Sequence, residues 1–497
     1  MKKLFFLLLL FISCQNFSQE TMTPLEKSDF KKLTTHSELS QFIKEVDDKS
    51  DLITTEVFAK SPEGRELFVV YFSKGEFGKD QSKIKVLIFA QQHGDEQSGK
   101  EGSLLLINEL LKPENQYLFD KIDFALVPLM NPDGSEKDKR RNGNEMDLNR
   151  NHLILTEPEV IGLHQLFNKY LFEVTMDVHE YWPFGESSKK FGYHENYDET
   201  IGAITNINIS EKLRKLSYDK YLPFIFNYIS EKNFSAFHYL PGGSSESENL
   251  RYSTFDINDG RQSFGIQNTL SFIQEGLNGE RSSLDNIEHR AKGQMIGMLG
   301  LLKFSYDNKD EIKKLVSAER KNLEENKTDG KVAIQLNHFS DGTELKLNLV
   351  SYNSGNDTVI TTRNFRSVVK SLYDVDRPKG YLIPKNLKEV TDWADRHELK
   401  YYDYNKSINS KIEQYFITNI DSIDFEGDMV VNPGVMKTDV TNQINSSDYI
   451  FIPVNQLRNN MIVIALEPKS ELGLVTYKQF EHLLKKGENY PILRVTN

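Results

Sequence analysis

Cysteine and tryptophan are scarce in this sequence of 497 residues, which has one cysteine and two tryptophans. A single cysteine excludes an internal disulfide framework, so stability must come from the core and from any bound metal. The sequence also lacks a stripe of basic residues, and its net charge is -12, so we do not expect nucleic acid as a partner. We interpret the acidic balance as a solubility feature, and the sequence indicates no oligomeric state.

Long apolar runs are missing after the first residues, so no transmembrane helix is predicted there. The exception, residues 4–12, follows two lysines in "MKKLFFLLLLFISCQNFSQE". It is too short to cross a bilayer but has the length of the apolar region of a signal peptide. We therefore expect residues 1–20 to be a signal peptide and the protein to be exported.

Cys14 directly follows this apolar run, after Ser13. The arrangement resembles the lipobox of bacterial lipoproteins, in which the cysteine carries the lipid, although Phe11 stands where leucine is usual. Ordinary cleavage near Ser18 or Gln19 is the alternative. The two processing routes predict a lipid-anchored outer-membrane protein or a periplasmic or secreted one.

Strand and helix patterns alternate through the first 300 residues. This alternation predicts an α/β fold, with a sheet that has helices on its faces. In such sheets, functional groups gather at the carboxyl ends of the strands. The segment 61–73 is predicted to be a turn that leads into an alternating strand. The further predicted strands are 86–90, 124–129, 174–178 and 265–274, and the predicted helices are 35–49, 99–111, 157–171, 210–232, 287–303 and 308–325.

The composition changes at Gly330, where alternating strands with Asp-Gly and Gly-Asn turns begin. We place a domain boundary near residue 328. Residues 21–328 are predicted to form one domain, and 329–497 a second, β-rich α+β domain with helices at 386–397 and 476–486.

Two predicted strand ends each deliver a histidine. The strand 86–90 is followed by "QQHGDE", with His93 and Glu96 in an H-x-x-E pattern, and the strand 174–178 by His179. Separately, each motif is weak, since a solvated turn or a polar strand end is the more common explanation. Together they supply the three nitrogen and oxygen ligands of a hydrolytic zinc site, whose fourth position is left for water.

Further polar motifs lie between and after these histidines. The segment "NPDGSEKDKRRNGNEMDLNRN" carries Arg140, Arg141 and Arg150, which form either a solvated basic loop or a grip for a carboxylate. In "NTLSFIQEG", Glu275 ends an apolar strand, where an ordinary polar terminus is the alternative.

The ordered set H-x-x-E, N-P-D-G, R-N-x-N, D-L-N-R-N, D-x-H and a late strand-borne glutamate resembles the zinc metallocarboxypeptidase family, the relatives of pancreatic carboxypeptidase A. The resemblance spans residues 35–303, about half of the chain, and implies the α/β fold of that family, a mixed, twisted sheet with helices on both faces. It makes 21–328 the expected catalytic domain and 329–497 an accessory one. By position it implies that His93, Glu96 and His179 are the zinc ligands and that Arg141 polarises the scissile carbonyl. Asn149 and Arg150 would bind the substrate carboxylate, and Glu275 would be the general base. Asp147 would hydrogen-bond to a zinc-bound histidine.

The segment before Glu275 departs from the family pattern. Family members carry a mobile-loop tyrosine about twenty residues before the base; Tyr252 has about that spacing, and Tyr239 is its rival. No single residue can be identified as the one that sets the preference for substrate side chains. Asp256, Asp259 and Arg261 are all candidates, since they lie near Glu275 in the sequence.

The sequence thus predicts an exported hydrolase with one zinc ion per chain. It would cut a peptide or amide bond next to a free carboxylate. A peptidoglycan stem-peptide peptidase or an amide deacylase needs the same groups and stays as the first alternative. An inactive peptide-binding relative is the second, although such relatives usually lack a zinc ligand or the base, and all are present here.

Overall fold

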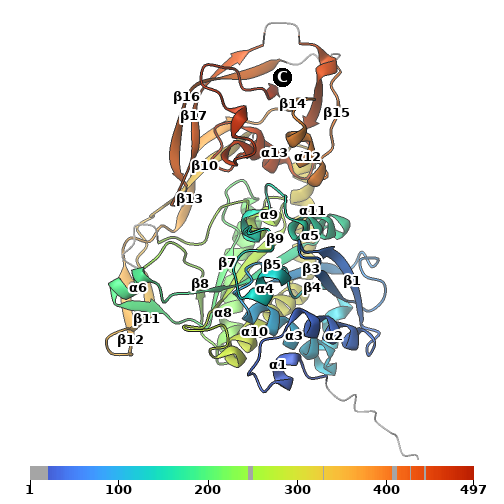
Figure 1. The fold of residues 1–497 in the computed structure, drawn as a ribbon, viewed down its shortest axis with the longest axis vertical. Helices are drawn as coiled ribbons and strands as arrows, with labels where there is room; N and C mark the ends of the chain where they lie inside the picture. The colour runs from blue at the N-terminus through green and yellow to red at the C-terminus, as the bar shows by residue number, and fades with distance from the viewer. Residues whose placement is uncertain are drawn as a thin grey trace, which may run out of the picture.

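The computed structural model describes residues 21–244, 250–327, 330–405, 411–425, 427–440 and 444–496. Its centre is a mixed sheet, in which the described residues form eight strands in the order β1-β2-β4-β3-β5-β9-β7-β8 (Figure 1). The strands are β1 Ile53–Lys60, β2 Glu66–Phe72, β3 Ile84–Ala90, β4 Ile122–Val127, β5 Val174–Tyr181, β7 Glu199–Ala203, β8 Ala236–His238 and β9 Leu270–Leu277.

The middle of the sheet is parallel, from β4 through β3 and β5 to β9. β1, β2 and β7 join by antiparallel pairing. The predicted α/β class with a mixed sheet is confirmed. The parallel arrangement brings the carboxyl ends of β3, β5 and β9 to the same edge of the sheet.

Helices cover both faces of this sheet because its central strands are apolar on both sides. In β3, Val86 and Ile88 pack into the larger core cluster, and Leu87 and Phe89 into the cluster on the opposite face. The helices of this part are α1 Pro24–Lys27, α2 His36–Asp47, α3 Ser98–Leu111, α4 Pro132–Lys137, α5 Pro158–Tyr170, α6 Glu186–Phe191, α7 Glu211–Leu216, α8 Leu222–Ser230, α9 Gly260–Gly265, α10 Ile287–Asp307 and α11 Lys309–Glu324.

The predicted strand 265–274 begins too early, since β9 starts at Leu270 and α9 occupies the preceding segment. The Asp259 carboxylate caps α9 by accepting a hydrogen bond from the Gln262 amide at 2.6 Å. Phe264 and Ile266, which extend the apolar pattern of the strand in sequence, are buried in this helix and its end instead. An apolar run alone does not separate a buried helix from a strand.

The later part of the chain is β-rich, and most of it lies at one end of the molecule, while β11 and β12 extend back beside α6 of the first part (Figure 1). A sheet in the order β15-β18-β14-β19-β16-β17 dominates it, beside the pair β10-β13 and the hairpin β11-β12. Its elements are β10 Lys331–Phe339, β11 Leu345–Ser351, β12 Asp357–Thr362, β13 Val368–Asp376, β14 Gly380–Pro384, α12 Lys388–Arg396, β15 Tyr402–Asp403, β16 Ile412–Phe425, β17 Asp428–Asp439, β18 Tyr449–Pro453, α13 Asn459–Leu466 and β19 Leu493–Val495.

The predicted helix 386–397 is present as α12, but the predicted helix 476–486 is wrong. Only the short 3-10 turns Leu474–Thr476 and Glu481–Leu483 occur there. Phe480, Leu483 and Leu484 are buried by these turns, and their spacing of three and four residues suits a 3-10 turn as well as an α-helix.

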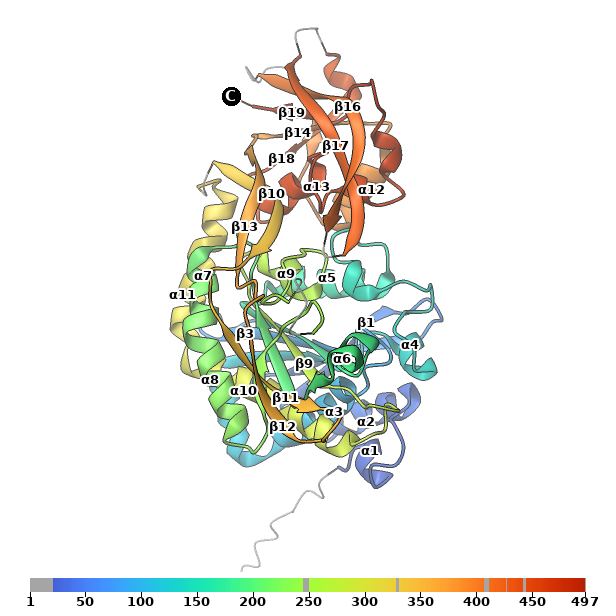
Figure 2. The ribbon, with the colours of Figure 1, turned by 90° about the vertical axis from the view of Figure 1, so that its left-hand side faces the viewer.

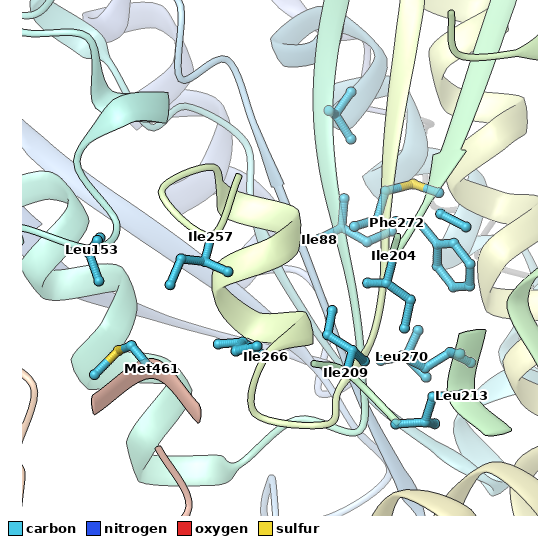
Figure 3. Close-up of a cluster of buried hydrophobic side chains, with 14 of the residues drawn as sticks. Ile88, Leu153, Ile204, Ile209, Leu213, Ile257, Ile266, Leu270, Phe272 and Met461 are labelled. Atoms are coloured by element: carbon cyan, nitrogen blue, oxygen red, sulfur yellow. The ribbon is translucent and has the colours of Figure 1, made fainter. Parts of the chain in front are cut away.

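The β-rich part is packed firmly against the first part. Its hairpin strand β11 pairs antiparallel with β6 (Tyr193–Glu195), far from the rest of the later sheets (Figure 2). Trp393 and His397 both contact the carbonyl oxygen of Leu153, at 2.8 and 2.7 Å. Met461 of α13 joins the same core cluster as Leu153 and the central strands (Figure 3).

Residues 1–20, with the predicted signal peptide and Cys14, lie outside the described residues, as does the predicted boundary at residue 328. Among the helices that the structure describes, none has the length and apolar character needed to cross a bilayer.

Candidate metal centre and active-site cleft

The turn after β3 presents His93 and Glu96 at the edge of the sheet. Gln91 takes a left-handed φ of 59°, which turns the chain out of the strand. Gly94 packs against the next loop so closely that a Cβ atom there would lie 2.2 Å from the backbone of Gly134. Only glycine fits at this close approach of the two loops. The turn packed in this way directs the side chains of His93 and Glu96 to the same metal-binding group.

The neighbouring strands deliver the other two groups. His179 in β5 and Glu275 in β9 are direct partners in the parallel register. Adjacent parallel strands lie about 5 Å apart, so residues at the same level necessarily face one site. The site therefore combines a turn with two strand ends at the carboxyl edge of the sheet.

His93, Glu96 and His179 form a buried group able to hold a metal ion. The two Nδ1 atoms lie 3.2 Å apart, and the Glu96 oxygens lie 2.7 Å from His93 Nδ1 and 2.8 Å from His179 Nδ1. Two donors about 2 Å from one zinc ion stand about 3.3 Å apart at the tetrahedral angle. The donor set and its spacing fit zinc.

The far nitrogens of both imidazoles contact carboxylates. Asp147 Oδ1 lies 3.1 Å from His93 Nε2, and Asp177 Oδ1 lies 2.8 Å from His179 Nε2. Such contacts fix the tautomer that leaves Nδ1 free for a metal. The sequence prediction included Asp147 but not Asp177, although alternation along a strand puts Asp177 on the same face as His179.

Charge in the site follows from burial and these contacts. Burial opposes ionisation of Glu96, but His93 and His179 outweigh it and hold the pKa of this carboxyl below its ordinary value. Glu275 has no such direct partner, so burial, with the nearby Glu96 charge, raises its pKa to about 7. One acid is thus kept ionised as a ligand, and the other is a stronger base than an ordinary carboxylate.

A cleft of about 200 Å³ opens over these groups, and we refer to it as the zinc cleft. Arg150 lies in its wall near Asp256 and Asp259, whose charges help to raise the arginine's pKa against the effect of burial. The lining residues are His93, Glu96, Arg140, Asn149, Arg150, Glu180, Tyr181, Tyr239, Thr254, Asp256, Asp259, Ile273 and Glu275.

Asn149 connects the cleft to the metal centre. Its side-chain oxygen accepts a hydrogen bond from Gly260 N at 2.7 Å, and its Nδ2 lies 3.2 Å from His179 Nε2. Gln92 donates to both Asn149 and Asp177. Sequence reasoning missed Gln92, because it is an ordinary polar residue until the fold brings these loops together.

Of the two adjacent arginines, Arg140 faces the metal centre. Its Nη1 lies 3.1 Å from His93 Nδ1, and its Nη2 lies 2.9 Å from Asp147. Arg141, the residue selected from sequence, is exposed and donates to the carbonyl oxygen of Glu145 at 2.9 Å. The turn thus sends Arg140, and not Arg141, toward the metal centre.

The two tyrosines considered for the mobile-loop role lie in different places. Tyr252 is 2% exposed and packs against Tyr218 and His238, outside the zinc cleft. Tyr239, its rival, lines the cleft. Arg261 is fully buried in an ion pair with Asp259 at 2.9 Å and does not reach the cleft wall.

Comparison with known proteins gives a consistent result. Residues 39–182 match the family model described as zinc carboxypeptidase. Carboxypeptidase 2 of Trichophyton rubrum is 23% identical over 455 residues, which cover 88% of this chain and 81% of that protein. Carboxypeptidase D of Mus musculus is 26% identical over 230 residues, covering 40% of this chain and 17% of that one.

Among solved structures, a metallo-carboxypeptidase from Burkholderia cenocepacia superposes with a TM-score of 0.43 and 18% identity, covering 56% of this chain and 70% of that one. The family match includes the turn with His93 and Glu96 and the strand with His179. Residues 39–182 therefore carry the zinc carboxypeptidase domain, and the chain is a hydrolase of the zinc metallocarboxypeptidase type.

Proposed function

We propose that this protein is an exported carboxypeptidase that cuts a peptide or amide bond next to a free carboxylate of its substrate. The observation that carries the proposal is the arrangement of the zinc cleft. A His-Glu-His metal set, a basic Glu275 and the cationic Arg150 line the same small cavity. Export rests on the apolar segment 4–12 and its preceding lysines.

Each residue has a distinct task in this proposal. Bound zinc would lower the pKa of a coordinated water and polarise the substrate carbonyl. Glu275 takes a proton from the attacking water and delivers it to the leaving amine, a task for which a pKa of about 7 is suited. Arg140 stabilises the negative charge that develops on the carbonyl oxygen.

Arg150 selects the bond that is cut. As a cation in the cleft wall, it binds the terminal carboxylate of the substrate with two parallel hydrogen bonds. This contact fixes the position of the neighbouring amide bond over Glu275 and the metal set. Asn149 supports the arrangement through its contacts with His179 and the start of α9.

We also propose residues 329–497 as a second domain that supports the first. Trp393 and His397 contact the carbonyl of Leu153, next to His152, whose Nε2 lies 2.9 Å from the Gln92 oxygen. Gln92 in turn bonds to Asn149 and Asp177. This chain of contacts links α12 to the metal centre.

The test of the proposal begins with the metal. We expect the purified protein to contain about one zinc per chain by elemental analysis, since the ligand set is complete and leaves one position open. Removal by a chelator should abolish hydrolysis of a peptide with a free carboxyl end, and zinc should restore it. His179→Ala should neither retain zinc nor recover activity. A native protein that holds no zinc and takes none up would contradict the proposal.

A second prediction separates the two adjacent arginines. We expect Arg140→Ala to lower kcat about 100- to 1,000-fold, the usual effect of losing one donor to a developing oxyanion. Arg141→Ala should stay within about twofold of the wild type, because this side chain is exposed and contacts only a backbone carbonyl. Steady-state kinetics with zinc analysis of each variant gives the answer. The reverse order of effects would restore Arg141 to the role that the sequence suggested.

A further inference from the structure

A second cavity, of about 320 Å³, lies beside the zinc cleft and shares Tyr181 and Tyr239 with it. Thr200 in its wall is the register partner of Glu275, so the two cavities occupy neighbouring strands of the sheet. We name it the aromatic cavity after the side chains that characterise it, together with one acid: Tyr181, Trp182, Phe191, Tyr193, Tyr239 and Glu195.

Glu195 is the unusual member of this wall. Its carboxylate makes no hydrogen bond or ion pair with any residue in the described ranges, and burial alone raises its pKa to about 7. No lysine or arginine of the described chain lines the cavity. Glu195 is partly buried, and a partly buried carboxylate without a partner suits a ligand that brings a positive charge.

The β-rich part of the chain holds this acid in place. Glu195 in β6 pairs with Leu349 of β11, and Leu349 itself lines the cavity. The Asn348 amide donates to the Tyr197 hydroxyl at 2.9 Å, and the Tyr181 hydroxyl donates to the Tyr197 carbonyl at 2.6 Å. The hairpin β11-β12 therefore forms the outer wall of a site whose inner wall belongs to the zinc cleft.

We propose that the aromatic cavity binds a cationic group of the substrate, an alkylammonium or a guanidinium. Aromatic faces attract cations through the quadrupole of the ring, and Glu195 supplies the opposite full charge. The proposal rests on the proposed function, since the substrate would occupy the zinc cleft and the aromatic cavity together. The cation is a basic side chain or the free amino terminus of a short peptide.

The first experiment measures kcat/KM for matched peptide pairs. Lysine is compared with norleucine before the scissile bond, lysine with norleucine after it, and a free amino terminus with an acetylated one. We expect the cationic member to be preferred roughly tenfold or more in at least one pair. That pair identifies the source of the cation. Glu195→Gln should bring the ratio close to one.

Glu186→Gln is the matched control, because it removes the same charge nearby from a side chain that is 97% exposed and does not line the cavity. It should keep the wild-type ratio. An equal preference in wild type and Glu195→Gln, or no preference in any pair, would overturn the proposal.

A binding measurement separates this proposal from the proposed function. Trp182 is 52% exposed and lines the cavity, whereas Trp393, the other tryptophan, is fully buried. Butylammonium should change the protein's intrinsic fluorescence with saturation, 1-butanol should not, and Glu195→Gln should lose the response. A protein that cleaves no peptide yet shows this pattern refutes the proposed function and keeps the cation site. An identical response of Glu195→Gln and wild type refutes the site.

Discussion

Glu275→Gln is expected to lower kcat by about two orders of magnitude or more while the protein keeps its zinc. The substitution preserves size and removes basicity. Glu275 is 7% exposed, is the register partner of His179 and has a pKa raised to about 7, so no other carboxylate of the cleft combines this position with this basicity. Glu180 is close in the lining, but its carboxylate is held by Arg290 at 3.0 Å.

The measurement compares single-turnover and steady-state rates with elemental analysis of the same samples. Glu280→Gln is the control, since it makes the same chemical change at an exposed position five residues further along. We expect it to behave like the wild type in both rate and zinc content. Near-normal turnover of Glu275→Gln with full zinc would show that another group is the base.

The second large effect concerns the substrate carboxylate. Amidating the terminal carboxyl of a good substrate should reduce kcat/KM for the wild type by at least about thirtyfold, or about 2 kcal/mol, because the paired hydrogen bond with Arg150 is lost. Arg150→Ala should reduce the rate on the free acid by a similar factor. On the amidated substrate it should cost little more, since the two groups act as a pair.

The test needs four rates, from the free and the amidated substrate on the wild type and on Arg150→Ala. The coupling between the carboxylate and Arg150 is the informative quantity, because a general loss of structure would slow both substrates equally. If the wild type cuts blocked and free substrates equally well, the cleavage next to a free carboxylate is refuted. An endopeptidase or a deacylase that ignores the distal carboxylate would then explain the cleft. Stem peptides with D-residues and N-acyl amino acids, tested alongside, identify the substrate class.

The sequence by itself determined the α/β class and indicated the candidate metal set. Both depend on local signals: short apolar runs, which form the buried central strands, and polar residues directly after the strand ends. His93, Glu96 and His179 were found in this way because parallel strands must end at a common edge. Glu275 was found for the same reason, as the polar end of the next strand.

Only the tertiary structure decided which member of a local pair enters the cleft. Arg140 and Arg141 have the same chemistry and adjacent positions, and the turn between α4 and Asp147 directs Arg140 inward. Tyr252 had the better spacing, yet its ring is buried against Tyr218, and Tyr239 takes the cleft position. Sequence spacing does not specify side-chain direction where the chain is irregular.

The tertiary structure also decided what the β-rich part contributes. Its strand composition was readable from alternation and turn residues, but its partners were not. Contacts such as Leu349 with Glu195 and Trp393 with Leu153 join residues more than 150 positions apart. Local propensity carries no information about such pairs, because they exist only when two independently patterned surfaces bury each other. Glu195 becomes a candidate binding group in the aromatic cavity only when β11 packs against β6.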